Sequence, residues 1–378
     1  MRCKPLCTVR RFEVRLRVRV CAVVGIGIVG GMLPVPGGMT AAAAEETAET
    51  EGIRTAPALT LPFPGFERGD FRWKIGPPVV ERPRDDAETT YFSIKDPSVV
   101  FFGERWHLFC TVRARPRTHQ VEYLSLRDWR DRKPQRTFLD IVDGYYCAPQ
   151  VFYFRPHRKW YLLYQTVMPD RKPQLQPAFS TNDRVDAPSA WSPPQPLFET
   201  SPDNVERWID FWIICDEERA YLFFTSLDGR FWRASTLLED FPGGWSRPVI
   251  ALQADIFEAA HVYRLRQAEA YLAIIEAQGG GRRYYKAFLS DSLDGHWRPL
   301  AAERDHPFLG PSNVEFEGEP WCQSFSHGEL LRSGYDQRME VDAQAGLTML
   351  FQGVGDAEMA GKAYGEIPWR LGLAVQRR

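Results

Sequence analysis

The stretch DPSVVFFGERWHLFCT at residues 96–111 contains two apolar runs around a Gly-Glu-Arg turn, the pattern of a buried β-hairpin. Similar hairpins begin at Gln150, Asp210 and Glu258, and a looser fifth copy begins at Ser326. The copies at Gln150 and Asp210 align with residues 96–111 without a gap. Recurrence of one supersecondary unit is the signature of a repeat architecture. Five hairpins predict an all-β, five-bladed β-propeller, in which each blade is a four-stranded antiparallel sheet.

The composition also favours β structure, because 13% of the residues are aromatic. From Leu61 onward, apolar segments of strand length alternate with Gly, Pro, Asp and Asn, and helical periodicity is almost absent. We therefore expect one catalytic domain over residues 61–378. A β-sandwich is the main alternative, but it gives no reason for polar residues at matched positions of the repeats. The net charge of -2 argues against nucleic-acid and membrane partners and favours a neutral, polar substrate.

The N-terminal segment has the pattern of an export signal. Seven Lys or Arg residues lie within the first 19 positions, and an apolar run follows from Val20 to Leu33. Small residues then precede Glu45, so we predict a secretory signal peptide over residues 1–44, a flexible lead-in over residues 45–60 and a secreted, extracellular protein. A retained membrane anchor is the alternative reading. We expect a mature protein that does not contact the membrane and that is a monomer.

Four cysteines remain after the predicted cleavage, and none of them belongs to a Cys-x-x-Cys pair. The spacing argues against a zinc site. Since each cysteine lies in or beside an apolar segment, we expect buried free thiols, with one disulfide as the alternative in an exported protein. The four residues are Cys110, Cys147, Cys215 and Cys322.

The residues that open the hairpins are polar: Asp96, Gln150, Asp210, Glu258 and, in the looser fifth copy, His327. In a propeller the innermost strands begin at one end of the central channel, so we expect these side chains to converge there and form the active site. Hydrolysis of a glycosidic bond needs one carboxylic acid and one carboxylate. A third carboxylate can raise the pKa of the acid by repulsion between like charges. Three acids at one channel end therefore predict a glycoside hydrolase.

The resemblance to a known family is spread over most of the chain. The strings are IKDPS (94–98), APQVFYF (148–154), KWYLLYQ (159–165), WIDFWIICD (208–216), FEAAHVY (257–263), DSLDG (291–295), SHGELLRSGYDQ (326–337) and PWRLGL (368–373). Together they resemble the α-L-arabinofuranosidases of glycoside hydrolase family 62. The resemblance implies an exported propeller enzyme that removes arabinofuranosyl branches from arabinoxylan with inversion.

Roles follow from the resemblance, residue by residue. Asp96 is the implied general base, Glu258 the general acid, and Asp210 the residue that orients the acid and tunes its pKa. For inversion, the carboxyls of base and acid should lie about 6.5–9.5 Å apart. Lys95 and Tyr364 are implied arabinose ligands.

Two further substrate contacts are expected at Trp208, which flanks Asp210, and at Gln150. His327 resembles a channel histidine that holds a structural calcium ion mainly through water, with Gln150 as a possible helper. A hydrogen-bonded core histidine is the alternative, since calcium prefers oxygen ligands. No organic cofactor is expected.

The sequence departs from the family at positions expected to contact the polymer. Thr166 stands where a tryptophan is common, Gly365 where Asn is common, and CQSF (322–325) replaces a Thr-Asn-Asp-like stretch. Two alternatives therefore stay open. One is a related propeller pentosidase, as in family 43, that acts on arabinan or xylo-oligosaccharides, and the other is a non-catalytic carbohydrate-binding propeller.

Overall fold

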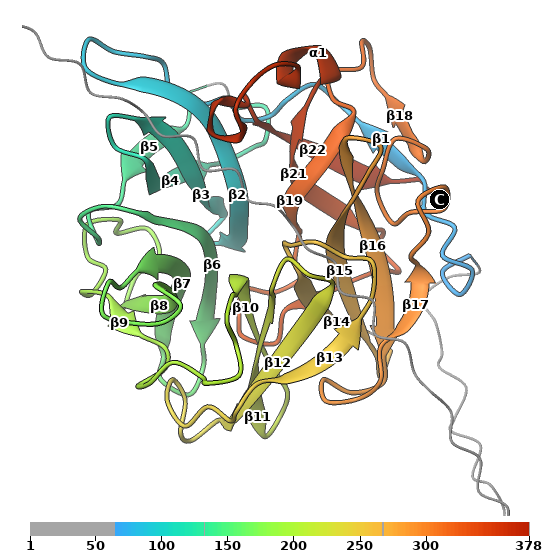
Figure 1. The fold of residues 1–378 in the computed structure, drawn as a ribbon. Helices are drawn as coiled ribbons and strands as arrows, with labels where there is room; N and C mark the ends of the chain where they lie inside the picture. Colours follow the sequence, from blue (N-terminus) through green and yellow to red (C-terminus); the bar gives the residue numbers. More distant parts are fainter. Residues whose placement is uncertain (1–64, 132, 267, 378) are drawn as a thin grey trace, which may run out of the picture. The chain divides into compact units, whose positions relative to one another are not determined.

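The computed structural model describes residues 65–131, 133–266 and 268–377. The predicted signal peptide (1–44) and lead-in (45–60) lie outside these residues. The described residues form five β-sheets that follow one another around a central axis (Figure 1). This arrangement confirms the predicted five-bladed β-propeller.

Blades 1 to 3 follow the chain in the simplest way, because each is a four-stranded antiparallel sheet built from consecutive strands. Their first strands lie innermost and contact one another around the axis. Blade 1 contains β2 (Thr90–Phe102), β3 (Arg105–Arg115), β4 (His119–Leu126) and β5 (Gln135–Phe138). Blade 2 contains β6 (Tyr146–Phe154), β7 (Lys159–Val167), β8 (Leu175–Asn182) and β9 (Gln195–Pro196). Blade 3 contains β10 (Ile209–Cys215), β11 (Arg219–Thr225), β12 (Arg230–Leu237) and β13 (Val249–Gln253).

Blades 4 and 5 each recruit strands from elsewhere in the chain. Blade 4 contains β14 (His261–Leu265), β15 (Tyr271–Gly279), β16 (Arg282–Ser290) and β17 (Arg298–Ala301), with β20 (Glu340–Val341) parallel to β14. Blade 5 contains β19 (Ser324–Leu330), β21 (Thr348–Val354) and β22 (Arg370–Gln376), followed by β1 (Trp73–Ile75) and β18 (Val314–Phe316). Between β21 and β22 lie the short helices α1 (Asp356–Met359) and η1 (Tyr364–Glu366).

The ring closes where β1, from the start of the domain, pairs antiparallel with β22, from its end. Side chains alternate along β1, so that Trp73 and Ile75 are buried while Lys74 is exposed. The Trp73 indole N–H donates to the Phe308 carbonyl at 2.5 Å, and the two rings pack edge to face. The pairing of β1 with β22 therefore joins the two ends of the domain, and Trp73 packs β1 against the segment that follows blade 4.

One end of the central channel is closed by the segment that follows β19. Its Arg332 donates to the carbonyl oxygens of Val99 at 2.9 Å and Val151 at 2.8 Å, one from blade 1 and one from blade 2. A buried ion pair with Glu329 balances the guanidinium charge. Paired protein side chains thus fill this part of the channel.

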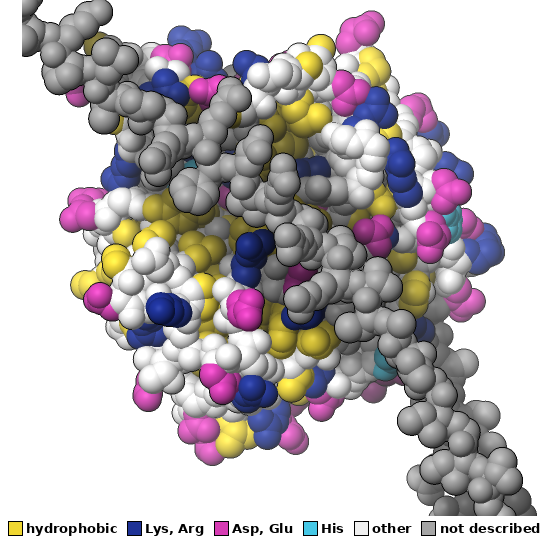
Figure 2. All heavy atoms as spheres, viewed as in Figure 1, with side chains coloured by type: hydrophobic (Ala, Val, Ile, Leu, Met, Phe, Trp, Pro, Cys, Tyr) yellow, Lys and Arg dark blue, Asp and Glu magenta, His cyan; other side chains and the backbone are white. Residues whose placement is uncertain are grey.

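The surface carries both signs of charge, and acidic and basic side chains are interspersed over the face shown in Figure 2. This distribution agrees with the small net charge of the chain. Within the described ranges, no helix is long and apolar enough to cross a membrane.

Candidate active site

The open end of the channel is shaped by a repeated irregularity of the inner strands. In blades 1 to 4 one residue within the innermost strand or just before it has a positive φ: Asp96 (48°), Ala148 (50°), Asp210 (56°) and Ala259 (51°). Strand pairing shifts register at the first three of these positions. Bulges of this kind re-aim side chains and are common beside active sites. Here the bulges direct Asp96 and Asp210, and the residue that precedes each of the four positive-φ positions, toward the channel end.

The bulge frees a backbone N–H from the strand ladder, and a side chain of the preceding blade accepts a hydrogen bond from this N–H. The Asp96 N–H donates to Gln352 Oε1 at 2.9 Å, and the Asp210 N–H donates to Gln165 Oε1 at 3.1 Å. The Ala259 N–H donates to Asp210 Oδ2 at 3.0 Å. Each bulge is therefore fixed by its neighbour, as expected for buried backbone groups.

The bulges correct one part of the repeat alignment. Asp96 and Asp210 do occupy equivalent positions, but Glu258 lies one residue before the equivalent Ala259, and Gln150 lies two residues after Ala148. The gapless alignment of blade 2 was wrong because its first turn is two residues longer: Phe102 pairs with Arg105, whereas Phe154 pairs with Lys159.

Two predicted substrate ligands lie away from the cavity. Gln150 bridges blades 2 and 3, since its amide oxygen accepts from the Ile213 N–H and its amide nitrogen donates to the Ile213 carbonyl, both at 2.7 Å. Trp208 is 1% exposed and packs among phenylalanines, with its indole N–H on the Leu175 carbonyl. Both side chains have structural partners, so the structure does not place them as sugar ligands.

A cavity of about 370 Å³ opens at this end of the channel. It brings together six of the predicted site residues: Lys95, Asp96, Asp210, Glu258, His327 and Tyr364. Sequence reasoning missed its other wall residues: His119, Tyr145, Cys147, Gln165, Ile209, Leu227, Phe257 and Arg283. Cys147 and Ile209 share the pre-bulge position of Lys95 and Glu258, so a correct repeat alignment would have found them.

Asp96 lies in an environment that favours its charged form. Burial alone would raise the pKa of this carboxyl, but the Lys95 ammonium, the His327 imidazole and a hydrogen bond from Thr111 outweigh it and hold the pKa below its usual range. The Lys95 Nζ lies 3.9 Å from Asp96 Oδ2. Asp96 is therefore ionised at neutral pH and suited to act as a base.

The other two carboxyls are shifted in the opposite direction. Burial, followed by the charge of Asp96, raises the pKa of Asp210 to about 7. Burial and the charge of Glu276 raise the pKa of Glu258 to about 8, against an opposing effect of Arg283. Carboxyls whose environments separate their pKa values in this way can serve as acid and base in one reaction.

The predicted calcium site can be tested against its donor atoms. His327 Nδ1 lies 3.4 Å from Asp96 Oδ1 and 3.7 Å from Asp210 Oδ2, so this nitrogen already faces two carboxylates. Gln150, the predicted helper, is engaged with Ile213. Among the described residues, no group of three or more His, Cys, Asp or Glu is placed to hold a metal ion. These residues do not fit a calcium ion bound directly by the protein, which prefers six to eight oxygen ligands.

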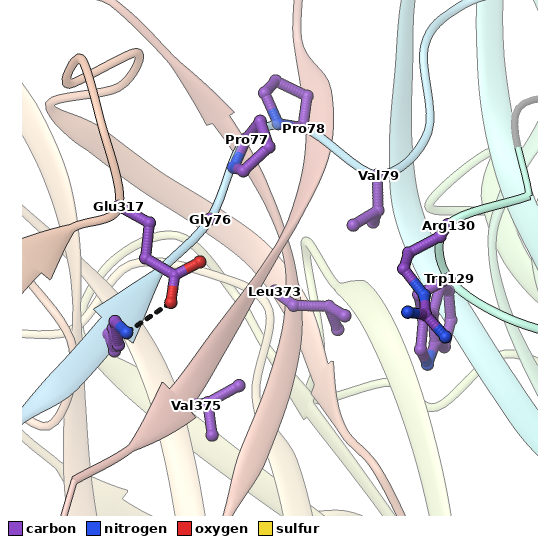
Figure 3. A pocket seen from close by; sticks show the side chains of 10 residues that line it. Gly76, Pro77, Pro78, Val79, Trp129, Arg130, Glu317, Leu373 and Val375 are labelled. Atoms are coloured by element: carbon purple, nitrogen blue, oxygen red, sulfur yellow. Dashed lines mark ion pairs between the residues drawn. The ribbon is translucent and has the colours of Figure 1, made fainter.

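A second cavity, of about 340 Å³, lies at the seam between blades 5 and 1 (Figure 3). Its walls are mainly Pro77, Pro78, Leu373 and Trp129, and the Lys74–Glu317 ion pair lies along one side. Because it contains no pair of carboxyls, it lacks the groups needed for acid and base catalysis of glycoside cleavage.

Comparison with known proteins agrees with the geometry. Residues 87–375 match the model of Glycosyl hydrolase family 62. The chain belongs to this family. The match therefore places the chain in family 62 and not in family 43.

This family 62 chain is similar to characterised and solved relatives. It is 35% identical over 314 residues to α-L-arabinofuranosidase C of Cellvibrio japonicus, covering 81% of this chain and 47% of that protein. The chain thus spans about half the length of this curated relative. The catalytic domain of a family 62 α-L-arabinofuranosidase from Coprinopsis cinerea has a TM-score of 0.76 and 36% identity, covering 82% of this chain and 98% of that one. An α-L-arabinofuranosidase of Podospora anserina in complex with cellotriose has a TM-score of 0.75 and 32% identity, covering 82% of this chain and 98% of that one.

Proposed function

We propose that this family 62 protein is an exported α-L-arabinofuranosidase that removes terminal arabinofuranosyl groups from arabinoxylan or related oligosaccharides with inversion. The observation that carries the proposal is the single cavity that holds an ionised Asp96 together with Glu258, whose pKa is raised to about 8. One group is ready to accept a proton and the other to donate one at neutral pH.

In the proposed reaction, Glu258 donates its proton to the glycosidic oxygen as the bond from that oxygen to the anomeric carbon breaks. Asp96 accepts a proton from a water molecule whose oxygen attacks the opposite face of the same carbon. The products are arabinose of inverted configuration and the shortened polysaccharide. Asp210, which accepts the Ala259 N–H beside Glu258, orients the acid and adds the repulsion that keeps it protonated.

The closed channel supports removal of a terminal sugar. Because Arg332 and its partners close the far end, a sugar enters and leaves by one mouth only. At that mouth the Lys95 ammonium can donate to sugar hydroxyls, and the Tyr364 ring, 50% exposed, lies 5.4 Å from it. A chain cannot be threaded through the channel, and a single branch sugar can enter by this mouth.

A solved relative supports the proposal that the substrate is arabinoxylan or a related oligosaccharide. The Podospora anserina relative was solved with cellotriose, a β-1,4-linked trisaccharide like the backbone of xylan in its linkage. In this chain Thr166 is buried and its hydroxyl donates to the Tyr145 carbonyl, while Tyr145 itself lines the cavity. We propose that Tyr145 supplies the aromatic surface at this side of the site.

Two further proposals, on export and on a calcium ion, do not follow from the geometry of the active site. Export rests on the pattern of residues 1–44, and N-terminal sequencing of protein recovered from culture medium tests it. A structural calcium ion would have to be held by His327 with water as its other ligands, and no step of the reaction runs through it. A fall in the thermal midpoint with EDTA that calcium reverses would support the ion.

The activity is tested with p-nitrophenyl α-L-arabinofuranoside and arabinoxylan, using the wild type and Glu258→Gln. We expect arabinose from both substrates with the wild type. The variant should lose more activity on arabinoxylan, whose leaving oxygen needs protonation, than on the nitrophenyl glycoside. Release of xylose would favour the related pentosidase. Release of no sugar from either substrate would favour a non-catalytic carbohydrate-binding propeller.

A further inference from the structure

The β15–β16 hairpin of blade 4 carries two charged side chains toward the active-site cavity. Glu276 pairs with Tyr285 and Gln278 pairs with Arg283, so Glu276 and Arg283 are diagonal neighbours on one face of the hairpin. The Glu276 side chain is 0% exposed and that of Arg283 is 14% exposed. A buried carboxylate and a nearly buried guanidinium are costly unless each is paired.

The two residues form one chain of contacts that ends on the catalytic acid. Arg283 Nη1 contacts Glu258 Oε1 and lies 2.5 Å from Glu276 Oε1. The second oxygen of Glu276 accepts from the Ser326 hydroxyl at 2.7 Å and from the His327 N–H at 2.9 Å. Every polar atom of the Glu276 carboxylate is therefore held in place.

Glu276 also fixes the backbone of the acid. Its N–H donates to the Glu258 carbonyl at 3.0 Å, and its carbonyl accepts from the Phe257 N–H at 2.7 Å. These bonds extend the pairing of blade 4 beyond the bulge at Ala259. Glu276 thus fixes the position of the Glu258 backbone and also pairs with the Arg283 guanidinium that contacts the Glu258 carboxyl.

The need for Glu276 follows from Arg283. A guanidinium in contact with a carboxyl favours the ionised form, and an ionised Glu258 has no proton to donate. A second carboxylate on the same guanidinium offsets this effect, because the Arg283–Glu276 pair has no net charge. Burial and the remaining repulsion then favour the protonated acid.

We propose that Glu276 and Arg283 are positioning residues for the general acid: Glu276 neutralises Arg283 so that Glu258 binds its proton, and Arg283 holds the carboxylate left after donation. This inference rests on the proposed role of Glu258. The proton that leaves Glu258 goes to the glycosidic oxygen, and solvent water returns one before the next turnover. No other reactant is required.

Other charged groups also face Glu258. Asp210 of β10 raises its pKa. The Lys95 ammonium of β2 and the Tyr364 hydroxyl of η1 interact with Glu258 across the cavity. The Arg283 guanidinium lies 5.2 Å from the Tyr364 ring, so Arg283→Met also changes the surroundings of Tyr364. Glu276→Gln leaves that contact and the Asp210 and Lys95 side chains in place, so its effect is separable from theirs.

The test compares the pH dependence of kcat/KM for Glu276→Gln and Arg283→Met on p-nitrophenyl and methyl α-L-arabinofuranosides. Glu276→Gln removes a negative charge and should move the alkaline limb to lower pH by about one unit, whereas Arg283→Met removes a positive charge and should move it to higher pH. In Glu276→Gln, activity at neutral pH should fall more on the methyl glycoside, whose leaving group needs the proton.

Controls keep the proposal falsifiable. Arg282→Gln changes the neighbouring arginine, which faces outward and pairs with the half-exposed Asp356, so its pH profile should equal that of the wild type. Glu276→Asp keeps the charge and should keep the alkaline limb, and thermal unfolding identifies any variant that fails to fold. Alkaline limbs that stay in place in both folded test variants would overturn the positioning role while leaving the proposed function intact, whereas a wild type without activity would overturn the function itself.

Discussion

Asp96 and Asp210 occupy the same bulge position on the innermost strands of blades 1 and 3, with φ angles of 48° and 56°. The His327 imidazole faces both carboxyls, at 3.4 and 3.7 Å. Burial raises the pKa of both carboxyls, but the Lys95 and His327 side chains outweigh it at Asp96, whereas the charge of Asp96 adds to it at Asp210, so the two pKa values are shifted in opposite directions. Two aspartates at equivalent backbone positions therefore differ in the protonation state that their surroundings favour.

The role of Asp96 as a base is tested by Asp96→Asn. Asn tolerates a positive φ better than most residues, so the change removes the charge with little backbone strain. We expect kcat to fall by roughly 10²–10⁴-fold on every substrate, since activation of water does not depend on the leaving group. A similar midpoint of thermal unfolding would show that the fold is kept, and near-normal kcat would argue against Asp96 as the base.

The wild-type pH profile should be bell-shaped. Activity should rise as Asp96 ionises, at a pH below the ordinary range for an aspartate. It should fall again as Glu258 loses its proton, near its raised pKa of about 8. Steady-state kcat/KM between pH 3 and 10 measures both limbs, and an alkaline limb unchanged in Glu258→Gln would contradict the assignment of the acid.

Asp210 should destabilise the fold as pH rises. Its folded pKa is about 7, above the ordinary value of 3.8, so between these two values the native state keeps a proton that the unfolded chain has lost. Stability from this group is therefore present below the lower value and lost as pH rises toward the upper one. Asp210→Asn should be more stable than the wild type at pH 8 by up to about 4 kcal/mol, and much less so at pH 4. Denaturant unfolding at the two pH values checks this, and an equal difference at both would count against it.

Ring closure should depend on Trp73. The strand β1 that carries Trp73 pairs with β22 of the last blade, and the Trp73 ring holds β1 in place by packing against Phe308. Trp73→Ala should lower the free energy of unfolding by about 3–5 kcal/mol. Lys74→Ala on the exposed face of the same strand is the matched control, with an expected change within about 0.5 kcal/mol. Equal losses in the two variants would mean that packing of Trp73 does not hold the ring closed.

The blade pattern could be predicted because hairpin repeats leave a periodic signal in the apolar residues. The register of the hairpins could not be predicted fully, because turns of different length leave the same pattern of apolar residues. The longer turn of blade 2 therefore misplaced Gln150 relative to Asp96. The closing strand β1 has only three residues, too few for a periodic pattern. Its place in blade 5, between β22 and β18, depends on contacts with the other end of the domain.

Site residues that belong to sequence motifs could be predicted. Residues that reach the cavity only through the packing of the strands could not. Asp96, Asp210 and Glu258 meet in one cavity, as the sequence indicated. Arg283 follows no motif, and it reaches Glu258 only because the β15–β16 hairpin extends past the bulge. Trp208 was misread because an indole beside an acidic residue can belong either to a sugar platform or to the core, and only burial distinguishes them.

The central claim is that Asp96 activates water while Glu258 protonates the leaving oxygen. Proton NMR of the first arabinose released from an α-L-arabinofuranoside, recorded before the anomers equilibrate, tests it most directly. The account predicts β-L-arabinofuranose as the initial product. Initial release of the α anomer, which requires a covalent intermediate and closer carboxyls, would contradict it.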